Sequence, residues 1–245
     1  MYGKHALAEA LNARPDVVRK VYLAPDFKDR ELRALLVKHT VPTDTLKSGT
    51  EMVGREASHQ GVVALINPTS LLAPFDTFIR DFVVTPKTAL VVLGEVQDPH
   101  NVGAIIRSAA AFGLAGVLIP EHNQAGITGA VIKASAGMVF KIPLVSIGNV
   151  NATVRILKDK GFWIYGLDGE GDHDLHTETF DAAAAFIVGN EGAGIREKTL
   201  AACDIVLKIP MHERTESLNA AVSSAIVMYE WSTYHPASRA TNLGA

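Results

Sequence analysis

From residue 88 onward the chain alternates short apolar runs with segments of helical period, and this alternation constrains the fold more than any other feature. The apolar runs have the four-to-eight-residue length of a buried strand. They are apolar throughout, which is typical of parallel strands covered on both faces by helices. The expected strands span 89–95, 116–119, 140–146, 163–167, 184–188 and 205–209, and the expected helices span 102–112, 129–136, 150–160, 195–201 and 217–234.

The first part of the chain has the pattern of a smaller α/β module. Its expected elements are a helix over 4–13, a strand over 17–24, an amphipathic helix over 29–39 and a strand over 61–66. A stretch of mixed character with three prolines follows, which is typical of a connector. We therefore predict a front domain over 1–67, a linker over 68–87 and an α/β domain over 88–245.

The composition of the chain excludes several classes of protein. No apolar run approaches the roughly 18 residues of a membrane span, and the first residues lack the pattern of a signal peptide, so the expected location is the cytoplasm. The single cysteine, Cys203, excludes an internal disulfide and a cysteine-cluster metal site. The net charge of −3 argues against binding nucleic acid through bulk electrostatics, but residues 1–80 hold 11 Lys and Arg against 9 Asp and Glu. Any RNA contact is therefore expected on the front domain and on local patches.

Three polar loops each follow an apolar run and precede a helix. If the strands before them lie side by side in a parallel sheet, the loops emerge at its carboxyl edge, where ligands of open α/β sheets bind. The sequence therefore predicts one site built from three distant segments. These segments are Asp98-Pro99-His100-Asn101-Val102-Gly103 through Arg107, Val188-Gly189-Asn190-Glu191-Gly192-Ala193-Gly194, and Ile209-Pro210-Met211 through Ser217-Leu218-Asn219-Ala220.

The first segment carries two candidate residues. Asn101 follows a strand-to-helix turn, so its ordinary role is an N-cap. Arg107 stands on a helix that is apolar nearly all round, and its guanidinium must find a partner or face a polar cavity. Side chains on a helix lean toward its N-terminus, so Arg107 can reach back toward the loop that holds Asn101. A structural ion pair is the alternative interpretation of Arg107.

The second and third segments add further candidates. The glycine spacing at 189–194 is G-x-x-G-x-G, and it differs from the G-x-G-x-x-G that opens a dinucleotide-binding unit, which disfavours a nicotinamide enzyme. Glu191 is either a surface acid or an acceptor for a ribose or an amine. Ser217 is expected to cap the last helix, with Asn219 in its first turn. Residues 172–176 hold Asp and His without the spacing of a ligand set, so we expect no metal.

Taken together, the three segments resemble the three motifs of the SpoU (TrmH-type) family of RNA ribose 2′-O-methyltransferases. The front module is similar to that family's substrate-binding domain, which is related to a ribosomal-protein fold. This second resemblance rests on Tyr2-Gly3-Lys4-His5-Ala6-Leu7 and His59-Gln60-Gly61-Val62-Val63-Ala64. Both resemblances together span nearly the whole chain.

The resemblance implies a fold, a cofactor and an assembly. The fold is an α/β methyltransferase domain with a trefoil knot, a rare departure from unknotted topology. The cofactor is S-adenosylmethionine, and the assembly is a homodimer whose active sites use both subunits, with the small residues after Ser217 at the interface. The expected cofactor-binding residues are Gly189, Ile209, Leu218, Leu167, Asn190 and Gly194.

The resemblance also assigns activation of the ribose hydroxyl to Arg107. Side-chain chemistry alone favours His100, His212 or Glu191 as the base, because Arg stays protonated in proteins. The role of Arg107 therefore stays open between base and phosphate clamp. The residues expected to position the reactants around it are Asn101, Glu191, Ser217 and Asn219.

The expected reaction is methyl transfer to the ribose 2′-hydroxyl of an RNA nucleotide, with a guanosine in 23S rRNA as the first candidate. A transfer RNA substrate is an alternative. A non-catalytic RNA-binding assembly factor and another cofactor enzyme on a doubly wound sheet are further alternatives. The modest charge of the front domain predicts recognition by shape and a few local contacts.

Overall fold

The larger part of the molecule is a single eight-stranded sheet. The structure is a computed structural model that describes residues 1–46 and 59–236. The strand order is β4-β7-β6-β5-β10-β8-β11-β9, and every neighbouring pair is parallel. The strands are β4 (Leu72–Pro74), β5 (Ala89–Leu93), β6 (Gly116–Pro120), β7 (Leu144–Ile147), β8 (Trp163–Leu167), β9 (His173–Asp174), β10 (Ala184–Val188) and β11 (Ile205–Lys208). The predicted parallel α/β fold is confirmed.

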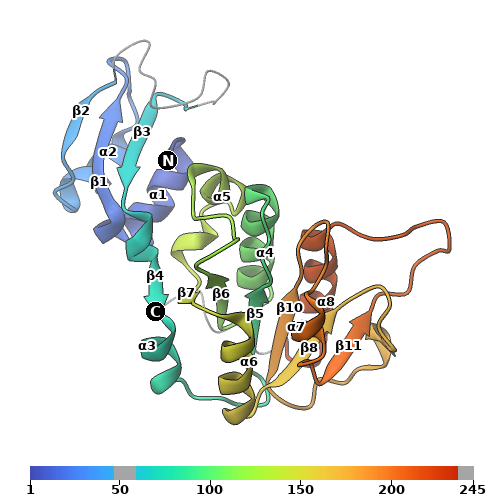
Figure 1. Cartoon of the computed structure of the whole chain (residues 1–245). Helices are drawn as coiled ribbons and strands as arrows, with labels where there is room; N and C mark the ends of the chain where they lie inside the picture. Colours follow the sequence, from blue (N-terminus) through green and yellow to red (C-terminus); the bar gives the residue numbers. More distant parts are fainter. Residues whose placement is uncertain (47–58, 237–245) are drawn as a thin grey trace.

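Helices cover both faces of this sheet (Figure 1). Alternate residues of β5 enter different cores: Val91 and Leu93 join the core that includes α4 and α8, whereas Leu90 and Val92 join the core that includes α3 and α6. Every side chain of β5 is therefore buried, which explains its unbroken apolar run. The helices are α3 (Phe75–Arg80), α4 (Pro99–Ala111), α5 (Gly129–Ala134), α6 (Val150–Asp159), α7 (Glu197–Leu200) and α8 (Ala220–Tyr234). Among the described residues, no helix combines the length and apolar character needed to cross a bilayer.

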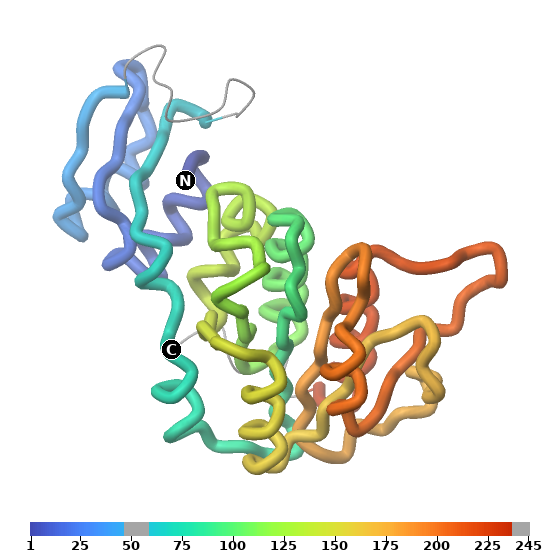
Figure 2. Tube along the Cα trace, viewed as in Figure 1, coloured from blue at the N-terminus to red at the C-terminus, as the bar shows by residue number. Residues whose placement is uncertain are grey.

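The front part folds around a three-stranded sheet of order β2-β1-β3. Its elements are α1 (Lys4–Ala13), β1 (Val18–Leu23), α2 (Arg30–Lys38), β2 (Thr43–Thr45) and β3 (Val62–Ile66). The α1 helix packs against the turn that follows α5, where the Lys141 ammonium lies 2.6 Å from the Glu9 carboxylate. The front part thus rests on the helical layer that also holds α4, and it stands at one end of the sheet (Figure 2).

Several element boundaries differ from those expected. Asp98, rather than Asn101, is the N-cap of α4, since its carboxylate accepts from the His100 amide. Asn219, rather than Ser217, is the N-cap of α8, so this helix begins at Ala220. In both cases a second capping side chain stood within three residues of the expected one.

The segment 68–87 contains regular structure that its prolines did not suggest. β4 pairs with β7 as the edge strand of the large sheet, and α3 follows it directly. Pro74 ends β4, a position at a sheet edge that proline tolerates. The two-residue strand β9, at the opposite edge, was also not expected from the sequence.

Candidate active site

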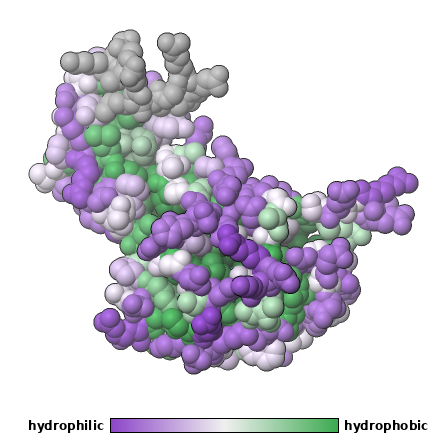
Figure 3. Space-filling view, in the orientation of Figure 1, coloured by the Kyte–Doolittle hydropathy of each residue, from purple (hydrophilic) through white to green (hydrophobic). Residues whose placement is uncertain are grey.

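The three polar loops emerge at one edge of the sheet. β5 and β10 pair directly, while β8 lies between β10 and β11, so the three strands that precede the loops are not all adjacent. The loop after β11 projects from the body of the molecule before the chain returns to α8 (Figures 1 and 2). Its tip is a hydrophilic arm on the surface (Figure 3).

A chain of hydrogen bonds joins all three segments. The Asn101 side-chain amide donates to Oε1 of Glu191 at 3.0 Å, and the Asn219 amide donates to Oδ1 of Asn101 at 2.9 Å. The backbone amides of Asp98 and Gln97 donate to the same carboxylate at 2.9 and 3.1 Å. Asn101 is 6% exposed, so its amide holds Glu191 and Asn219 from a buried position.

This arrangement fixes the charge of Glu191. Burial raises the pKa of its carboxyl, but the hydrogen bonds from Asn101 and from the Asp98 and Gln97 amides lower it more, and the net pKa lies below the ordinary value. Glu191 is therefore a carboxylate at neutral pH and acts here as a hydrogen-bond acceptor.

Beside the hydrogen bonds that join Glu191, Asn101 and Asn219 lies a cleft of about 370 Å³, between the ends of β8, β10 and β11. This volume is within the ordinary range of small-molecule sites. Glu191 and Ser217 line the cleft, as do all six residues expected to bind the cofactor: Leu167, Gly189, Asn190, Gly194, Ile209 and Leu218.

The glycine loop, residues 189–194, is tightly bonded within itself. Asn190 and Gly194 exchange both backbone hydrogen bonds at 2.9 Å, and Oδ1 of Asn190 accepts from the amides of Gly192 and Ala193. A Cβ on Gly189 would lie 2.3 Å from the backbone carbon of Gly194, so only glycine fits there. The backbone amides of residues 192–194 thus donate their hydrogen bonds inside the loop.

Arg107 is exposed on α4. It lies six residues beyond Asn101, about 9 Å along the helix axis, and within the described part of the chain no hydrogen bond or ion pair joins it to the glycine loop. Its guanidinium makes no hydrogen bond or ion pair with any residue of 1–46 or 59–236. The structural ion pair is therefore not found in this part of the chain, and the charge faces solvent.

An open apolar groove of about 630 Å³ adjoins the hydrogen-bond chain. It lies between α4 and α8, where the small residues of α8 let the two helices approach. Val222 and Tyr229 are 47% and 52% exposed on its α8 side. Arg107 is the α4 neighbour of the groove residues Ala104 and Ser108. The groove is lined by His100, Asn101, Ala104, Ser108, Asn219, Ala221, Val222, Ala225, Ile226 and Tyr229.

The sequence reasoning missed several residues around the cleft. Asp168 and Glu170 follow β8 and belong to none of the three polar segments, while Met211 and Glu216 lie within the third segment but were not singled out as candidates. The position of Asp168 directly after a buried strand was a usable signal, because it places the residue at the same sheet edge. Its Oδ1 accepts from the Glu170 amide at 2.9 Å, which fixes the turn.

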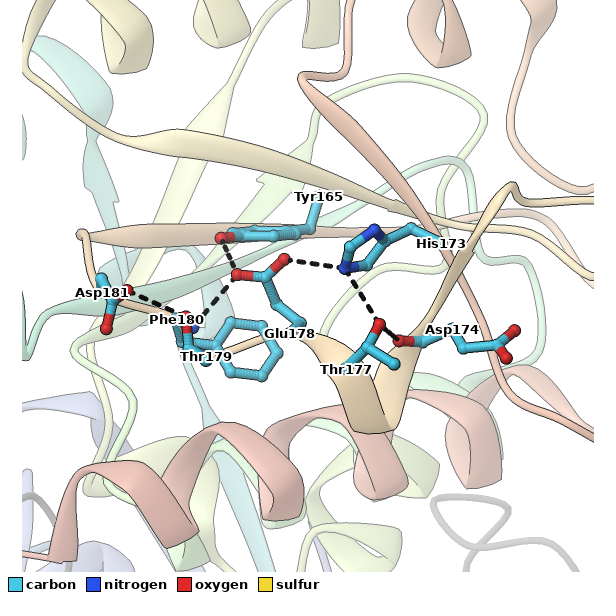
Figure 4. A network of polar contacts seen from close by, with 8 residues as sticks. All are labelled: Tyr165, His173, Asp174, Thr177, Glu178, Thr179, Phe180 and Asp181. Carbon is cyan, nitrogen blue, oxygen red and sulfur yellow. Dashed lines mark hydrogen bonds and ion pairs between the residues drawn. The ribbon is translucent and has the colours of Figure 1, made fainter.

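The histidine-containing segment near β9 forms a polar network (Figure 4). Glu178 accepts from the Tyr165 hydroxyl and the Phe180 amide, and its second oxygen lies 3.2 Å from Nε2 of His173. Burial, together with the Glu178 charge, raises the pKa of Tyr165, so the phenol stays neutral. Through Glu178, this network joins Tyr165 of β8 to His173 of β9 and so stabilises this edge of the sheet.

Cys203 is a free, partly buried cysteine. Burial raises the pKa of its thiol to about 12, and its Sγ lies 3.3 Å from the Thr199 carbonyl oxygen. A thiol with so high a pKa is not a nucleophile at neutral pH.

Comparison with known proteins identifies the class. Residues 88–229 match the SpoU rRNA Methylase family, and residues 1–72 match the RNA 2′-O ribose methyltransferase substrate-binding family. The chain belongs to the SpoU family of RNA methyltransferases, and the resemblance drawn from the three motifs is confirmed.

Individual relatives are similar over nearly their full length. The chain is 33% identical to the 23S rRNA (guanosine-2′-O-)-methyltransferase RlmB of Vibrio vulnificus, with 94% of each protein covered. It is 34% identical to a putative TrmH family tRNA/rRNA methyltransferase of Staphylococcus aureus, with 93% of each covered. Among solved structures, the SpoU methyltransferase AviRb of Streptomyces viridochromogenes in complex with the cofactor AdoMet superposes with a TM-score of 0.79 at 25% identity, covering 96% of this chain and 89% of that one.

Proposed function

We propose that this protein transfers the methyl group of S-adenosylmethionine to the ribose 2′-hydroxyl of a guanosine in 23S rRNA. The family and the RlmB relatives support the reaction and the substrate. The observation that carries the proposal is the hydrogen-bond chain Glu191-Asn101-Asn219, because it joins all three family motifs beside the cleft.

The cleft fits S-adenosylmethionine in shape and charge. Apolar side chains of Leu167, Leu207 and Ile209 offer a surface for the adenine ring. Gly194 and Asp168 lie close together in the cleft wall: a Cβ at Gly194 would lie 3.9 Å from Oδ2 of Asp168, and the backbone φ of +67° there favours glycine. The described residues around the cleft include four carboxylates and no Lys, Arg or His, which suits a cofactor of net positive charge.

The residues around the cleft have distinct proposed roles. Bound S-adenosylmethionine supplies an electrophilic methyl group at its sulfonium. The six cleft residues named above hold the cofactor, while Asn101, Glu191, Ser217 and Asn219 orient the reactants, since orientation alone supplies several kcal/mol of such a barrier. The side chain of Arg107 is permanently charged and has no partner in residues 1–46 and 59–236, so we assign it to holding the nucleotide through the phosphate and ribose oxygens. The proton of the ribose 2′-hydroxyl then passes to a neighbouring general base or to a phosphate oxygen of the RNA.

We further propose that two copies of the chain pair across the groove between α4 and α8. An apolar, open groove with exposed Val222 and Tyr229 is the kind of surface that a subunit covers. Such a pairing brings the partner next to Asn101 and Asn219. Light scattering should give the mass of a dimer for the wild type and of a monomer for Val222→Glu.

Three further points belong to this proposal. The segment between β11 and α8 forms the trefoil knot implied by the family. The front domain over 1–67 binds the RNA, with 68–87 joining it to the methyltransferase domain over 88–245.

Because the proposed substrate is rRNA, the proposed location of the enzyme is the cytoplasm.

The substrate is tested by mapping ribose methylation in total RNA from cells with and without the gene. We expect one guanosine in 23S rRNA to lose its 2′-O-methyl group in the deletion strain and to regain it with the wild-type gene but not with Arg107→Ala. A methyl group lost from tRNA instead would favour the activity suggested by the TrmH relatives. Unchanged methylation in all RNA would favour a non-catalytic assembly factor.

A further inference from the structure

Glu95, which follows β5 by two residues, adopts a left-handed backbone conformation with φ +67°. Residues other than glycine are rare in this region, and they persist where surrounding contacts over-determine the conformation. The Glu95 side chain is 25% exposed. A glycine would adopt this backbone easily, so the contacts of Glu95 need an explanation.

Glu95 holds both ends of the glycine loop. Its carbonyl oxygen accepts from Nδ2 of Asn190 at 2.9 Å, at the start of the loop. Its carboxylate Oε2 accepts from Nε and Nη2 of Arg196 at 3.0 and 2.7 Å, two residues after the loop ends at Gly194. One residue therefore anchors the chain on both sides of the loop.

The segment 95–98 also makes a third contact with the glycine loop. The amides of Gln97 and Asp98, two and three residues after Glu95, donate to the carboxylate of Glu191 at the middle of the loop. Asp98 also caps α4, which carries Asn101 and Arg107. The position of the glycine loop relative to α4 is thus set by residues 95–98.

The glycine loop is braced internally by its two backbone hydrogen bonds and by the Asn190 side chain. Its placement over the cleft is consequently decided by its anchors. Neither Glu95 nor Arg196 lines the cleft.

We propose that Glu95 and Arg196 are positioning residues that set the glycine loop at the spacing S-adenosylmethionine requires. This inference rests on the proposed cofactor site. Loss of the pair lets the loop shift as a unit, which weakens cofactor binding, whereas the residues that act on the bound nucleotide keep their places on α4 and α8.

The test is a double-mutant cycle with Arg196→Ala, Glu95→Gln and both together. Arg196 is 68% exposed, so its truncation leaves the core intact. Calorimetry measures binding of S-adenosylhomocysteine, and steady-state kinetics separate KM for S-adenosylmethionine from kcat. We expect Arg196→Ala to raise Kd and KM about fivefold, the upper end of what a partly exposed ion pair contributes, with kcat within twofold of the wild type. The double variant should resemble Arg196→Ala, and Arg196→Lys should be intermediate.

Lys158→Ala is the matched control. The Lys158 ammonium lies 2.7 Å from the Asp204 carboxylate, in another partly exposed ion pair of the same domain. We expect its Kd to match the wild type. A Kd for Arg196→Ala equal to that of Lys158→Ala, or additive effects in the double variant, would overturn the positioning role while leaving the proposed function intact. Absence of S-adenosylhomocysteine binding by the wild type would overturn both.

Discussion

Two loops face each other across the cleft, and they are built in opposite ways. The glycine loop, 189–194, is bonded within itself and to residues 95–98. In the loop over 211–219, the Thr215 amide donates to the His212 carbonyl oxygen, and the Arg214 amide donates to Nδ1 of the His212 ring. Residues 212–217 are all exposed. Among the described residues of this loop, Asn219 at its end is the only one that is hydrogen-bonded to the rest of the site.

This difference separates a preformed half of the site from a half that a ligand completes. A wall that is already bonded loses little conformational entropy when the cofactor binds, whereas an exposed loop with few bonds must be ordered at that moment. The proposed cofactor site therefore predicts that the glycine loop contributes most of the affinity and that the 211–219 loop becomes ordered only when the cofactor binds.

The largest effect is expected from breaking the preformed wall with Gly189→Ala. The new Cβ would lie 2.3 Å from the Gly194 carbon and 2.5 Å from the Ile195 nitrogen, both backbone atoms that cannot move aside cheaply. We expect binding of S-adenosylhomocysteine to fall by about 100-fold or more and stability to fall by about 1–3 kcal/mol. Calorimetry and thermal unfolding measure the two effects.

Gly192→Ala is the matched control in the same loop. Its Cβ would have Asn190 Oδ1 as nearest neighbour, at 3.6 Å. Wild-type binding is expected. If Gly192→Ala were as damaging as Gly189→Ala, the close backbone packing at residue 189 would not be the cause.

The next largest effect is expected from Asn101→Ala, which removes the link between the two walls. Asn101 is buried, and its loss leaves groups of Glu191 and Asn219 without their partner. We expect a destabilisation of about 1–3 kcal/mol and a loss of activity larger than this change in folding explains. Denaturant unfolding and methylation assays measure the two quantities. Ser217→Ala, in the open loop, should leave stability unchanged.

Hydrogen exchange tests the comparison without a mutation. The amides of Gly192, Ala193 and Gly194 are hydrogen-bonded inside their loop, so we expect slow exchange with or without ligand. The exposed segment 212–217 should exchange fast in the free protein and about tenfold more slowly with S-adenosylhomocysteine. Equal protection of both loops in the free protein would contradict the division into two halves.

The smallest effect is expected from lowering the pH, which acts on cofactor binding through the charge of Glu191. The pKa of Glu191 is lowered in the folded protein, so the stability from its ionised form is present above the ordinary value of 4.5 and is lost as pH falls through the lowered pKa. We expect S-adenosylhomocysteine binding to stay flat from about pH 8 down to the ordinary value of 4.5, and to decline only below it, as the Glu191 carboxylate becomes protonated. Glu191→Gln should bind more weakly and lack this decline, which calorimetry across pH detects.

The sequence predicted the sheet and its helices well because buried strands need unbroken apolar runs. It missed β4 and β9, since strands of three and two residues at sheet edges have too few residues for a pattern. It misassigned both helix caps because Asp98 and Asn101, like Ser217 and Asn219, are chemically equivalent candidates close in the chain.

The site was predictable in part. Its residue types and their motifs indicated a shared edge, but the insertion of β8 between β10 and β11 depends on tertiary packing that no local pattern encodes. Glu95 and Arg196 were missed because nothing in the sequence distinguishes Glu95 from an ordinary surface acid. Its role depends on the positive φ of its backbone, which only the structure shows. The solvent position of Arg107 was also missed, because small apolar neighbours on α4 suggested a buried helix.

The most direct measurement is mass spectrometry of nucleosides from ribosomal RNA incubated with the protein and isotopically labelled S-adenosylmethionine. The wild type should place the label on a ribose 2′-oxygen, and Arg107→Ala should lose this product by about three orders of magnitude while binding S-adenosylhomocysteine within twofold of the wild type. Label on a base, or full ribose methylation by Arg107→Ala, would contradict the account.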